Sequence, residues 1–123
     1  MPPISITVKG LKEVVAALKS KAGELQKKTD QALMKAGFFL EGEVKESIAG
    51  RRAEHSSVDT GRFLQSVSTI KKSKDSVMVE TDVEYANFLE YGTSKFPARS
   101  HFRNSAARNR EKVKQIFIDN LKE

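Results

Sequence analysis

The sequence predicts an α+β domain: a small antiparallel sheet, with a long N-terminal helix or helix pair, a short helix and a C-terminal helix packed on it. Three observations lead to this prediction. Several short segments alternate between apolar and polar side chains, apolar residues recur at three- and four-residue steps over longer stretches, and the two kinds of segment are mixed along the chain. The 123 residues fit one domain, residues 1–123, with one modest core.

The first part of the chain is expected to form a strand followed by helical structure. Residues 4–8 alternate between apolar and polar types and end at Gly10, as a half-buried strand does. Apolar stripes with helical spacing then cover residues 11–25 and 32–48. The polar pair Thr29-Asp30 lies between the stripes and leaves open whether one helix or two form here.

Two glycines lie inside the second helical stripe, Gly37 and Gly42. Glycine in a helix interior costs about 1 kcal/mol relative to alanine. Either the helix tolerates both residues, or another helix or subunit approaches closely at these positions.

A loop and a hairpin are expected next. Residues 49–59 are polar and lack periodicity, which predicts a mobile surface loop. Asp59 or Thr60 can then cap a short turn. Residues 63–70 and 77–82 alternate with period two on either side of a polar link, which predicts an antiparallel hairpin.

The last third of the chain is expected to be mainly helical. Residues 85–91 are typical of a short helix, and Gly92 is suited to end it. Residues 93–101 are irregular. Apolar residues between Phe102 and Leu121 then define a C-terminal helix.

Composition excludes several classes of site. The chain has no cysteine, which excludes disulfides, thiolate metal ligands and a cysteine nucleophile. It has no apolar stretch near the length of about 20 residues that spans a bilayer, so we expect no membrane partner. The net charge is +6, and residues 94–123 hold eight basic and three acidic residues. Such a face attracts nucleic acid or an acidic protein surface, or simply keeps the protein soluble.

Candidate catalytic groups are few. His55 falls in the predicted loop, and His101 falls among Arg99, Phe102 and Arg103, where positive charge disfavours an imidazolium. Both histidines are expected to be ordinary surface residues. There is no metal-binding spacing, no phosphate-binding glycine loop and no Gly-x-Ser-x-Gly motif. We therefore expect no enzyme, no catalytic or metal site and no cofactor.

One basic pattern favours an alternative function. Arg99, Arg103, Arg110 and Lys114 recur at steps of four, seven and four, so they form one stripe if the C-terminal helix begins early enough. Such a stripe can follow phosphates or contact an acidic partner. The alternative is a small basic nucleic-acid-binding protein without sequence specificity.

Segments spread along the chain resemble one known family. Residues 10–18 combine a strand-ending glycine with an apolar helix start, and residues 59–67 read Asp-Thr-Gly-Arg-Phe-Leu-Gln-Ser-Val. Residues 85–93, Tyr-Ala-Asn-Phe-Leu-Glu-Tyr-Gly-Thr, closely fit the pattern Tyr-Ala-x-x-Leu-Glu-aromatic-Gly-Thr, which is the most specific of these matches. Residues 97–106 are similar to an Arg-Pro-Phe-Leu-x-Pro-Ala segment but lack its second proline. Together these segments resemble the tailed-phage neck and tail-completion family, which includes relatives of the lambda minor tail protein Z.

The resemblance implies a virion structural protein that joins or completes the head–tail or neck region through subunit contacts. It implies other copies of the chain as partners, as a ring with six-fold symmetry as the usual expectation, together with head-connector or tail-tube proteins. It is compatible with non-specific contact of the basic C-terminal helix with DNA in the channel and equally with contact to an acidic neighbouring protein. The expected location is the virion, after assembly in the host cytoplasm. The matching motif residues are Thr60, Gly61, Arg62, Ser66, Tyr85, Ala86, Leu89, Glu90, Tyr91, Gly92 and Thr93.

Physical roles can be assigned within the most specific match. We expect the aromatic and leucine residues of 85–91 to anchor the short helix to the sheet, with the hydroxyl of Tyr85 or Tyr91 exposed. Glu90 is either a solvated carboxylate, or an acceptor for backbone N–H groups or for an arginine of the 60–62 turn. Gly92 would adopt a positive φ. The segments 49–59 and 93–101 are candidates for contacts that become ordered only on assembly.

Overall fold

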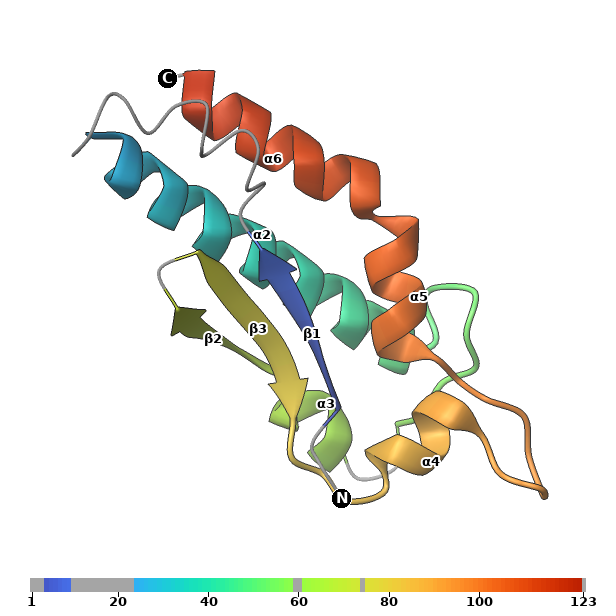
Figure 1. Cartoon of the computed structure of the whole chain (residues 1–123). Coiled ribbons are helices and arrows are strands. Elements are labelled where there is room, and N and C mark those ends of the chain that lie inside the picture. Colours follow the sequence, from blue (N-terminus) through green and yellow to red (C-terminus); the bar gives the residue numbers. More distant parts are fainter. Residues whose placement is uncertain (1–3, 10–23, 59–60, 74, 123) are drawn as a thin grey trace.

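A three-stranded antiparallel sheet with a long helix across one face forms the centre of the protein (Figure 1). The computed structural model describes residues 4–9, 24–58, 61–73 and 75–122. The strands are β1 (Ile4–Lys9), β2 (Ser68–Ser73) and β3 (Ser76–Thr81), in the order β1-β3-β2. The helix is α2 (Glu24–Ile48). The predicted α+β class with a small antiparallel sheet is confirmed.

The core lies between the sheet and α2. In β3, Val77, Val79 and Thr81 are fully buried, and they pair with Val8, Ile6 and Ile4 of β1. Their period-two spacing places these side chains on the same face of the sheet. Helix α2 fills this face with residues at helical spacing: Ala32, Leu33, Ala36, Leu40, Val44 and Ile48.

Helix α2 runs without a break through Thr29-Asp30. Thr29 is buried, and Asp30 forms an ion pair with Lys71 of β2 at 2.8 Å. Packing against the sheet thus outweighs the modest helix propensity of these two residues. Most of the first predicted stripe, residues 11–23, lies outside the described residues.

Close approach explains one of the two helix glycines. A Cβ on Gly37 would lie 2.6 Å from Cγ2 of Thr69 and 3.0 Å from Cγ2 of Val77. The approaching element is therefore the β2–β3 hairpin rather than another helix. In the part of the chain that the structure describes, no atom lies within 4 Å of a Cβ built on Gly42.

The hairpin is confirmed, but its first arm is shorter than predicted. Residues 62–66 form the short helix α3 (Arg62–Ser66), and β2 begins only at Ser68. Phe63 and Val67 are both buried and four residues apart, a spacing that a helical turn satisfies as well as a strand does. Gly61, with φ 85°, starts the turn and accepts the N–H of Gln65 at 2.9 Å.

The C-terminal part forms three helices, α4 (Ala86–Tyr91), α5 (His101–Arg108) and α6 (Arg110–Lys122). The predicted single C-terminal helix is divided at Asn109, which is buried and donates its side-chain N–H to the Ser105 carbonyl at 2.9 Å. This side-chain bond competes with the regular helix pattern. Helix α6 then lies along α2, with Lys35 bonded to Asn120 at 3.1 Å (Figure 1).

Candidate functional site

Helix α4, which carries most of the motif residues, has two unlike sides. Ala86 and Glu90 are four residues apart and buried. Phe88 and Tyr91 are 48% and 61% exposed. The prediction that these two rings anchor the helix to the sheet is wrong, because a helix of six residues can turn only one side to the core. Tyr85 does pack inward, with its ring edge-on to Phe63 at 5.8 Å between centroids.

The Glu90 carboxylate caps a neighbouring helix. Its Oε1 accepts the backbone N–H of Phe102 at 3.0 Å, and its Oε2 accepts the backbone N–H of Arg103 at 2.9 Å. These N–H groups belong to the first turn of α5, where a helix has no internal acceptors and where negative charge is favoured. The interpretation of Glu90 as an acceptor for backbone N–H groups is confirmed. The side chain is 2% exposed.

The arginine that accompanies Glu90 is Arg103. Its Nε donates to Glu90 Oε2 at 3.2 Å, and its Nη2 donates to the Glu90 carbonyl and to Ser100 Oγ, both at 2.8 Å. The guanidinium carbon lies 4.3 Å from the centroid of the Tyr91 ring, a cation–π arrangement. We call Glu90, Arg103 and the first turn of α5 the latch, because they fix α4 to α5 through charge-assisted bonds.

A closed turn follows α4 and extends from the end of the molecule (Figure 1). Gly92 has φ 78° and ψ 175°, as expected for a positive φ, and a Cβ there would lie 2.7 Å from the Ala98 nitrogen. The Thr93 N–H donates to the Phe96 carbonyl at 3.0 Å, and Thr93 Oγ1 accepts the N–H groups of Lys95 and Phe96. Residues 93–96 thus have regular internal bonds within one protomer, unlike the expectation of order only on assembly.

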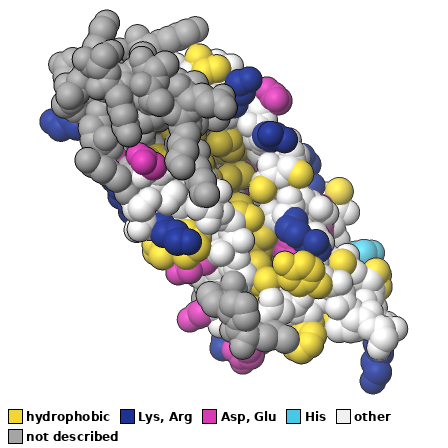
Figure 2. Space-filling model, viewed as in Figure 1, with side chains coloured by type: hydrophobic (Ala, Val, Ile, Leu, Met, Phe, Trp, Pro, Cys, Tyr) yellow, Lys and Arg dark blue, Asp and Glu magenta, His cyan; other side chains and the backbone are white. Residues whose placement is uncertain are grey.

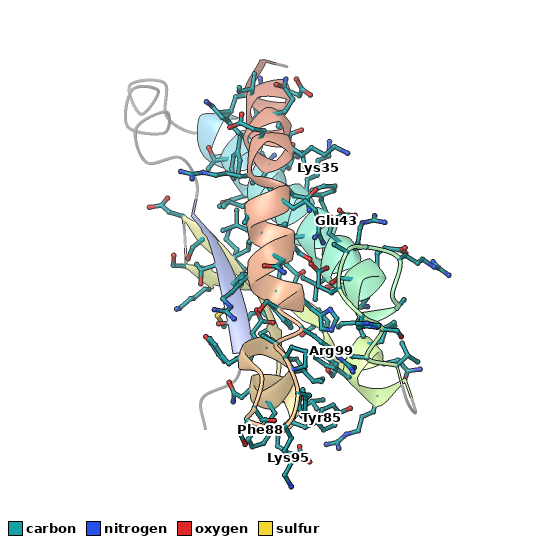
Figure 3. All side chains as sticks on the ribbon, turned by 90° about the vertical axis from the view of Figure 1, so that its right-hand side faces the viewer. Lys35, Glu43, Tyr85, Phe88, Lys95 and Arg99 are labelled. Carbon is teal, nitrogen blue, oxygen red and sulfur yellow. The ribbon has the colours of Figure 1, made fainter. Side chains whose placement is uncertain are left out.

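Between α4 and this turn lies an open hollow of about 530 Å³, which we call the apolar groove. Figure 3 shows Tyr85, Phe88 and Lys95 together at this end of the molecule. Hydrophobic side chains gather over α4 and the adjoining end of α5 (Figure 2). The groove is lined by Tyr85, Phe88, Leu89, Thr93, Ser94, Lys95 and Phe96.

A second hollow of about 570 Å³ shares Tyr85 and Leu89 with the apolar groove. Arg62 and Arg99 give it positive charge, so we call it the basic hollow. Arg62 forms an exposed ion pair with Glu84 at 3.2 Å, and Arg99 donates to the Ser56 carbonyl at 2.9 Å. The lining residues are Ser56, Ser57, Val58, Arg62, Tyr85, Leu89 and Arg99.

The two hollows bring two motif segments together. Arg62, from the Thr-Gly-Arg segment, lines the same hollow as Tyr85 and Leu89 from the most specific segment. Ser66 has an internal role, since its hydroxyl lies 2.6 Å from the Phe63 carbonyl as a donor. Thr60 lies outside the described residues.

A buried histidine holds the loop behind the basic hollow. His101 is fully buried, so the prediction of a surface residue is wrong. Its Nδ1 lies 2.8 Å from Ser47 Oγ and its Nε2 lies 2.8 Å from Ser57 Oγ. Ser47 donates its only hydroxyl proton to Glu54, so we assign the ring proton to Nδ1, and Nε2 accepts from Ser57. Burial lowers the pKa of His101 to about 4, with Glu54 opposing and Arg99 reinforcing this direction.

Glu54 anchors the same loop. Both of its carboxylate oxygens accept from Arg108, at 3.0 and 3.1 Å, and Asn104 donates to it at 3.0 Å. Burial raises the pKa of Glu54, but the hydrogen bonds from Arg108, Ser47 and Asn104 outweigh it and lower the pKa to about 2. The part of segment 49–59 that the structure describes therefore has a defined set of contacts within one protomer. No local pattern in the sequence indicates this network, because its members come from three separate segments.

The four predicted contact residues of the basic stripe do not share one helix face. Arg99 precedes α5 and bonds Ser56, and Arg103 belongs to the latch. Arg110 and Lys114 are exposed and four residues apart on α6. Only this second pair lies on one helical surface.

Two further findings concern metal binding and membrane crossing. Across residues 4–9, 24–58, 61–73 and 75–122, no three His, Cys, Asp or Glu side chains come together in a way that could hold a metal ion. In that same part of the chain, no helix has the length and apolar character needed to cross a membrane.

Comparison with known proteins identifies one family. The model of the HK97-gp10-like family, described as "Bacteriophage HK97-gp10, putative tail-component", matches residues 12–92. The match includes the helix α2, the hairpin and the motif helix α4. Comparisons with curated proteins and with solved structures found no match.

Proposed function

Because the chain belongs to the HK97-gp10-like family of phage tail components, we propose that it is a virion structural protein that joins or completes the head–tail region through subunit contacts. Its partners in this role are other copies of the chain, arranged as a ring, and head-connector or tail-tube proteins. It acts in the virion after assembly in the host cytoplasm. The role needs no catalytic step and no cofactor.

The observation that supports this proposal is the outer side of α4. Phe88 and Tyr91 are exposed aromatic rings on a helix whose inner side is fixed by Glu90. Exposed aromatic residues beside an open apolar hollow are typical of protein interfaces, where they supply much of the binding energy. A surface that is held in place before binding loses little entropy on assembly.

The latch explains why such a surface stays in place. A carboxylate that accepts two backbone N–H groups and an arginine fixes α4 relative to α5. Each charge-assisted bond of this kind contributes about 1.5–3 kcal/mol when partly buried. The motif therefore acts as a support on one side and as a contact surface on the other.

The experiment that tests the role removes the chain from the phage or prophage that encodes it. We expect electron microscopy to show heads and tails that remain unjoined, and antibody labelling of complete particles to place the chain at the junction. Normal joined virions without the chain would contradict the proposal.

Point variants in the same assay test whether the outer side of α4 is the surface that joins heads to tails. Phe88→Ser should lower the yield of joined particles by roughly tenfold or more, as expected for a central interface aromatic residue. The matched control is Ile70→Ser, which changes an exposed apolar residue on β2 and should leave the yield unchanged.

A second candidate function is non-specific nucleic-acid binding by α6. Arg110, Lys112 and Lys114 are exposed there. Binding of duplex DNA by the purified chain at increasing salt tests this candidate, because phosphate contacts release counterions and binding falls steeply with salt. Absence of binding at low salt would remove it.

A further inference from the structure

The two glycines of α2 differ in what surrounds them. Gly37 is required because β2 and β3 lie too close for any side chain. Gly42 is exposed, and a Cβ there would meet no atom of the described residues within 4 Å. Glycine is among the least favourable residues for a helix interior, so its use at an open position has no reason within the described protomer. Close approach of another chain to the helix backbone would supply one.

An exposed aromatic residue lies next to Gly42 on the same side of α2. Phe38 is 56% exposed and stands one helical turn before Gly42. Glu41, three residues after Phe38, is a partly exposed carboxylate that accepts from Thr69 and pairs with Lys45. We call Phe38, Glu41 and Gly42 the α2 patch. It offers one ring, one carboxylate and bare backbone within about 6 Å along the helix axis.

The α2 patch and the apolar groove are at different places on the molecule. In Figure 3, Lys35 and Glu43 mark the part of α2 that contains the patch, and Tyr85, Phe88 and Lys95 mark the groove at the other end. One copy can therefore use both surfaces at the same time, each with a different neighbour.

We propose that the α2 patch of one copy docks into the hollows beside α4 of a second copy, with the Phe38 ring in the apolar groove and Glu41 facing the basic hollow. This inference rests on the proposed assembly function and names the two surfaces that meet. Among the described residues, no side chain fills either hollow, so the partner copy completes the site.

The charges of the hollows and their distance from one another support the α2 patch of a second copy as the group that binds there. The apolar groove is adjacent to the basic hollow, because both are lined by Tyr85 and Leu89. The basic hollow presents Arg62 and Arg99, which suit a carboxylate next to an aromatic ring. Within the protomer Arg62 pairs with Glu84 and Glu41 pairs with Lys45, and both ion pairs are at least partly exposed, so rearranging them on docking costs little.

The contact is heterologous, since two different surfaces meet. Such contacts form closed rings when the rotation between copies closes, whereas a contact between identical surfaces stops at a dimer. The arrangement is therefore consistent with a ring of copies in the virion.

The absence of cysteine permits a direct test by disulfide trapping. Met34→Cys, one helical turn before Phe38, and Ser94→Cys, at the edge of the apolar groove, are combined in one chain so that both rings stay in place; the chain is assembled under reducing conditions and then oxidised. A disulfide forms only when the two Cα atoms lie within roughly 7 Å. We expect a ladder of covalent oligomers on a denaturing gel, because each copy carries both halves of the contact. The matched control is Lys27→Cys with Ser94→Cys, which moves the first cysteine two turns along α2 and should give no ladder.

The outcomes separate this inference from the proposed function. Covalent dimers from Met34→Cys alone would show a symmetric contact and overturn the inference. Assembled oligomers that give no ladder would also overturn it while leaving the assembly function intact. If the wild-type chain forms no oligomer, alone or on purified tails, the proposed function fails and the inference fails with it.

A second variant does not depend on oxidation. Gly42→Leu places a side chain on the bare backbone of the α2 patch and favours the helix. We expect self-association to weaken by roughly tenfold without a lower unfolding midpoint. Unchanged self-association would contradict a close approach at Gly42.

Discussion

The inner and outer sides of residues 84–96 use similar side chains for opposite purposes. On the inner side, the carboxylate of Glu90 is buried and bonded to backbone N–H groups and to Arg103. On the outer side, the carboxylate of Glu84 is 74% exposed and pairs with Arg62 across the surface. The rings divide in the same way, with Tyr85 packed against Phe63 and Phe88 exposed.

This difference assigns the stability of the fold to the inner side and assembly to the outer side. Groups on the inner side have no access to a partner, so changing them should alter folding first. Groups on the outer side contribute few contacts within the protomer, so changing them should alter assembly first. The predictions below test this division, beginning with the largest expected effect on stability.

Loss of the Glu90 side chain should be the most damaging single change. Glu90→Ala leaves two backbone N–H groups of α5 without acceptors and Arg103 without its carboxylate. Because the Arg103 side chain is half exposed, the cost comes mainly from the two hydrogen bonds between the carboxylate and the backbone N–H groups, at about 1.5–3 kcal/mol each, or about 3–6 kcal/mol together. Urea unfolding monitored by circular dichroism measures the change. Glu84→Ala is the matched control, and its free energy of unfolding should be far closer to that of the wild type. Equal losses in the two variants would contradict the division between an inner side for stability and an outer side for assembly.

A side chain at Gly92 should be the next most damaging change. Gly92→Ala must hold φ near 78° and ψ near 175°, a region that only glycine occupies readily, which costs about 1–3 kcal/mol. Its Cβ would also lie 2.7 Å from the Ala98 nitrogen, so the turn 93–96 must shift. The free energy of unfolding should fall by about 3 kcal/mol in total. Gly42→Ala should instead raise the free energy of unfolding, because alanine favours a helix and its Cβ has space among the described residues. A fall for Gly42→Ala as large as that for Gly92→Ala would contradict this difference between the two glycines.

Acid should weaken the inner polar network that holds the loop to α5. The pKa of His101 is about 4 in the folded protein, below the value of 6.5 for a free histidine. Its contribution is therefore complete above pH 6.5 and is lost as the pH falls toward 4, by about 2 kcal/mol between pH 7 and pH 5. The same argument places the loss from Glu54, with a folded pKa of about 2, between pH 4.5 and 2.

A variant isolates the histidine effect. His101→Asn has no titrating group at this position, so its stability should depend less on pH between 6.5 and 4 than that of the wild type. Unfolding midpoints measured across this window compare the two proteins. Parallel curves would show that His101 does not titrate as described.

Changes on the outer side should have the smallest effect on stability. Phe88→Ser removes a half-exposed ring with few contacts inside the protomer, and the free energy of unfolding should change by no more than about 0.5 kcal/mol. Thermal unfolding measures the change. A large loss of stability would mean that Phe88 belongs to the core rather than to a contact surface.

Much of the fold could be predicted because local patterns match it. The alternation in residues 4–8 and 77–81 marks strands that bury one face, and the stripe at 32–48 marks the buried side of α2. Helix α3 was predicted as strand because Phe63 and Val67 fit a period of two and a period of four equally well. The division between α5 and α6 depends on the hydrogen bond that the Asn109 side chain makes, which no periodicity indicates.

The sequence predicted which residues belong to the candidate site better than it predicted what each of them contacts. The motif pattern identified Glu90 and Gly92, and Glu90 proved to bind backbone N–H groups. Its arginine is Arg103, which lies 13 residues along the chain rather than in the 60–62 turn. The burial of His101 depends on Ser47 and Ser57, which lie 54 and 44 residues away. An apolar residue such as Phe88 gives no local sign of whether its partner is in the same chain or in another.

The most direct test of the division between the two sides is the binding of purified protein to tails made without it. Wild-type chain should bind these tails to saturation, and folded Phe88→Ser should bind roughly tenfold or more weakly in the same sedimentation assay. Equal binding by a variant with an unchanged unfolding midpoint would contradict the assignment of the outer side of α4 to assembly.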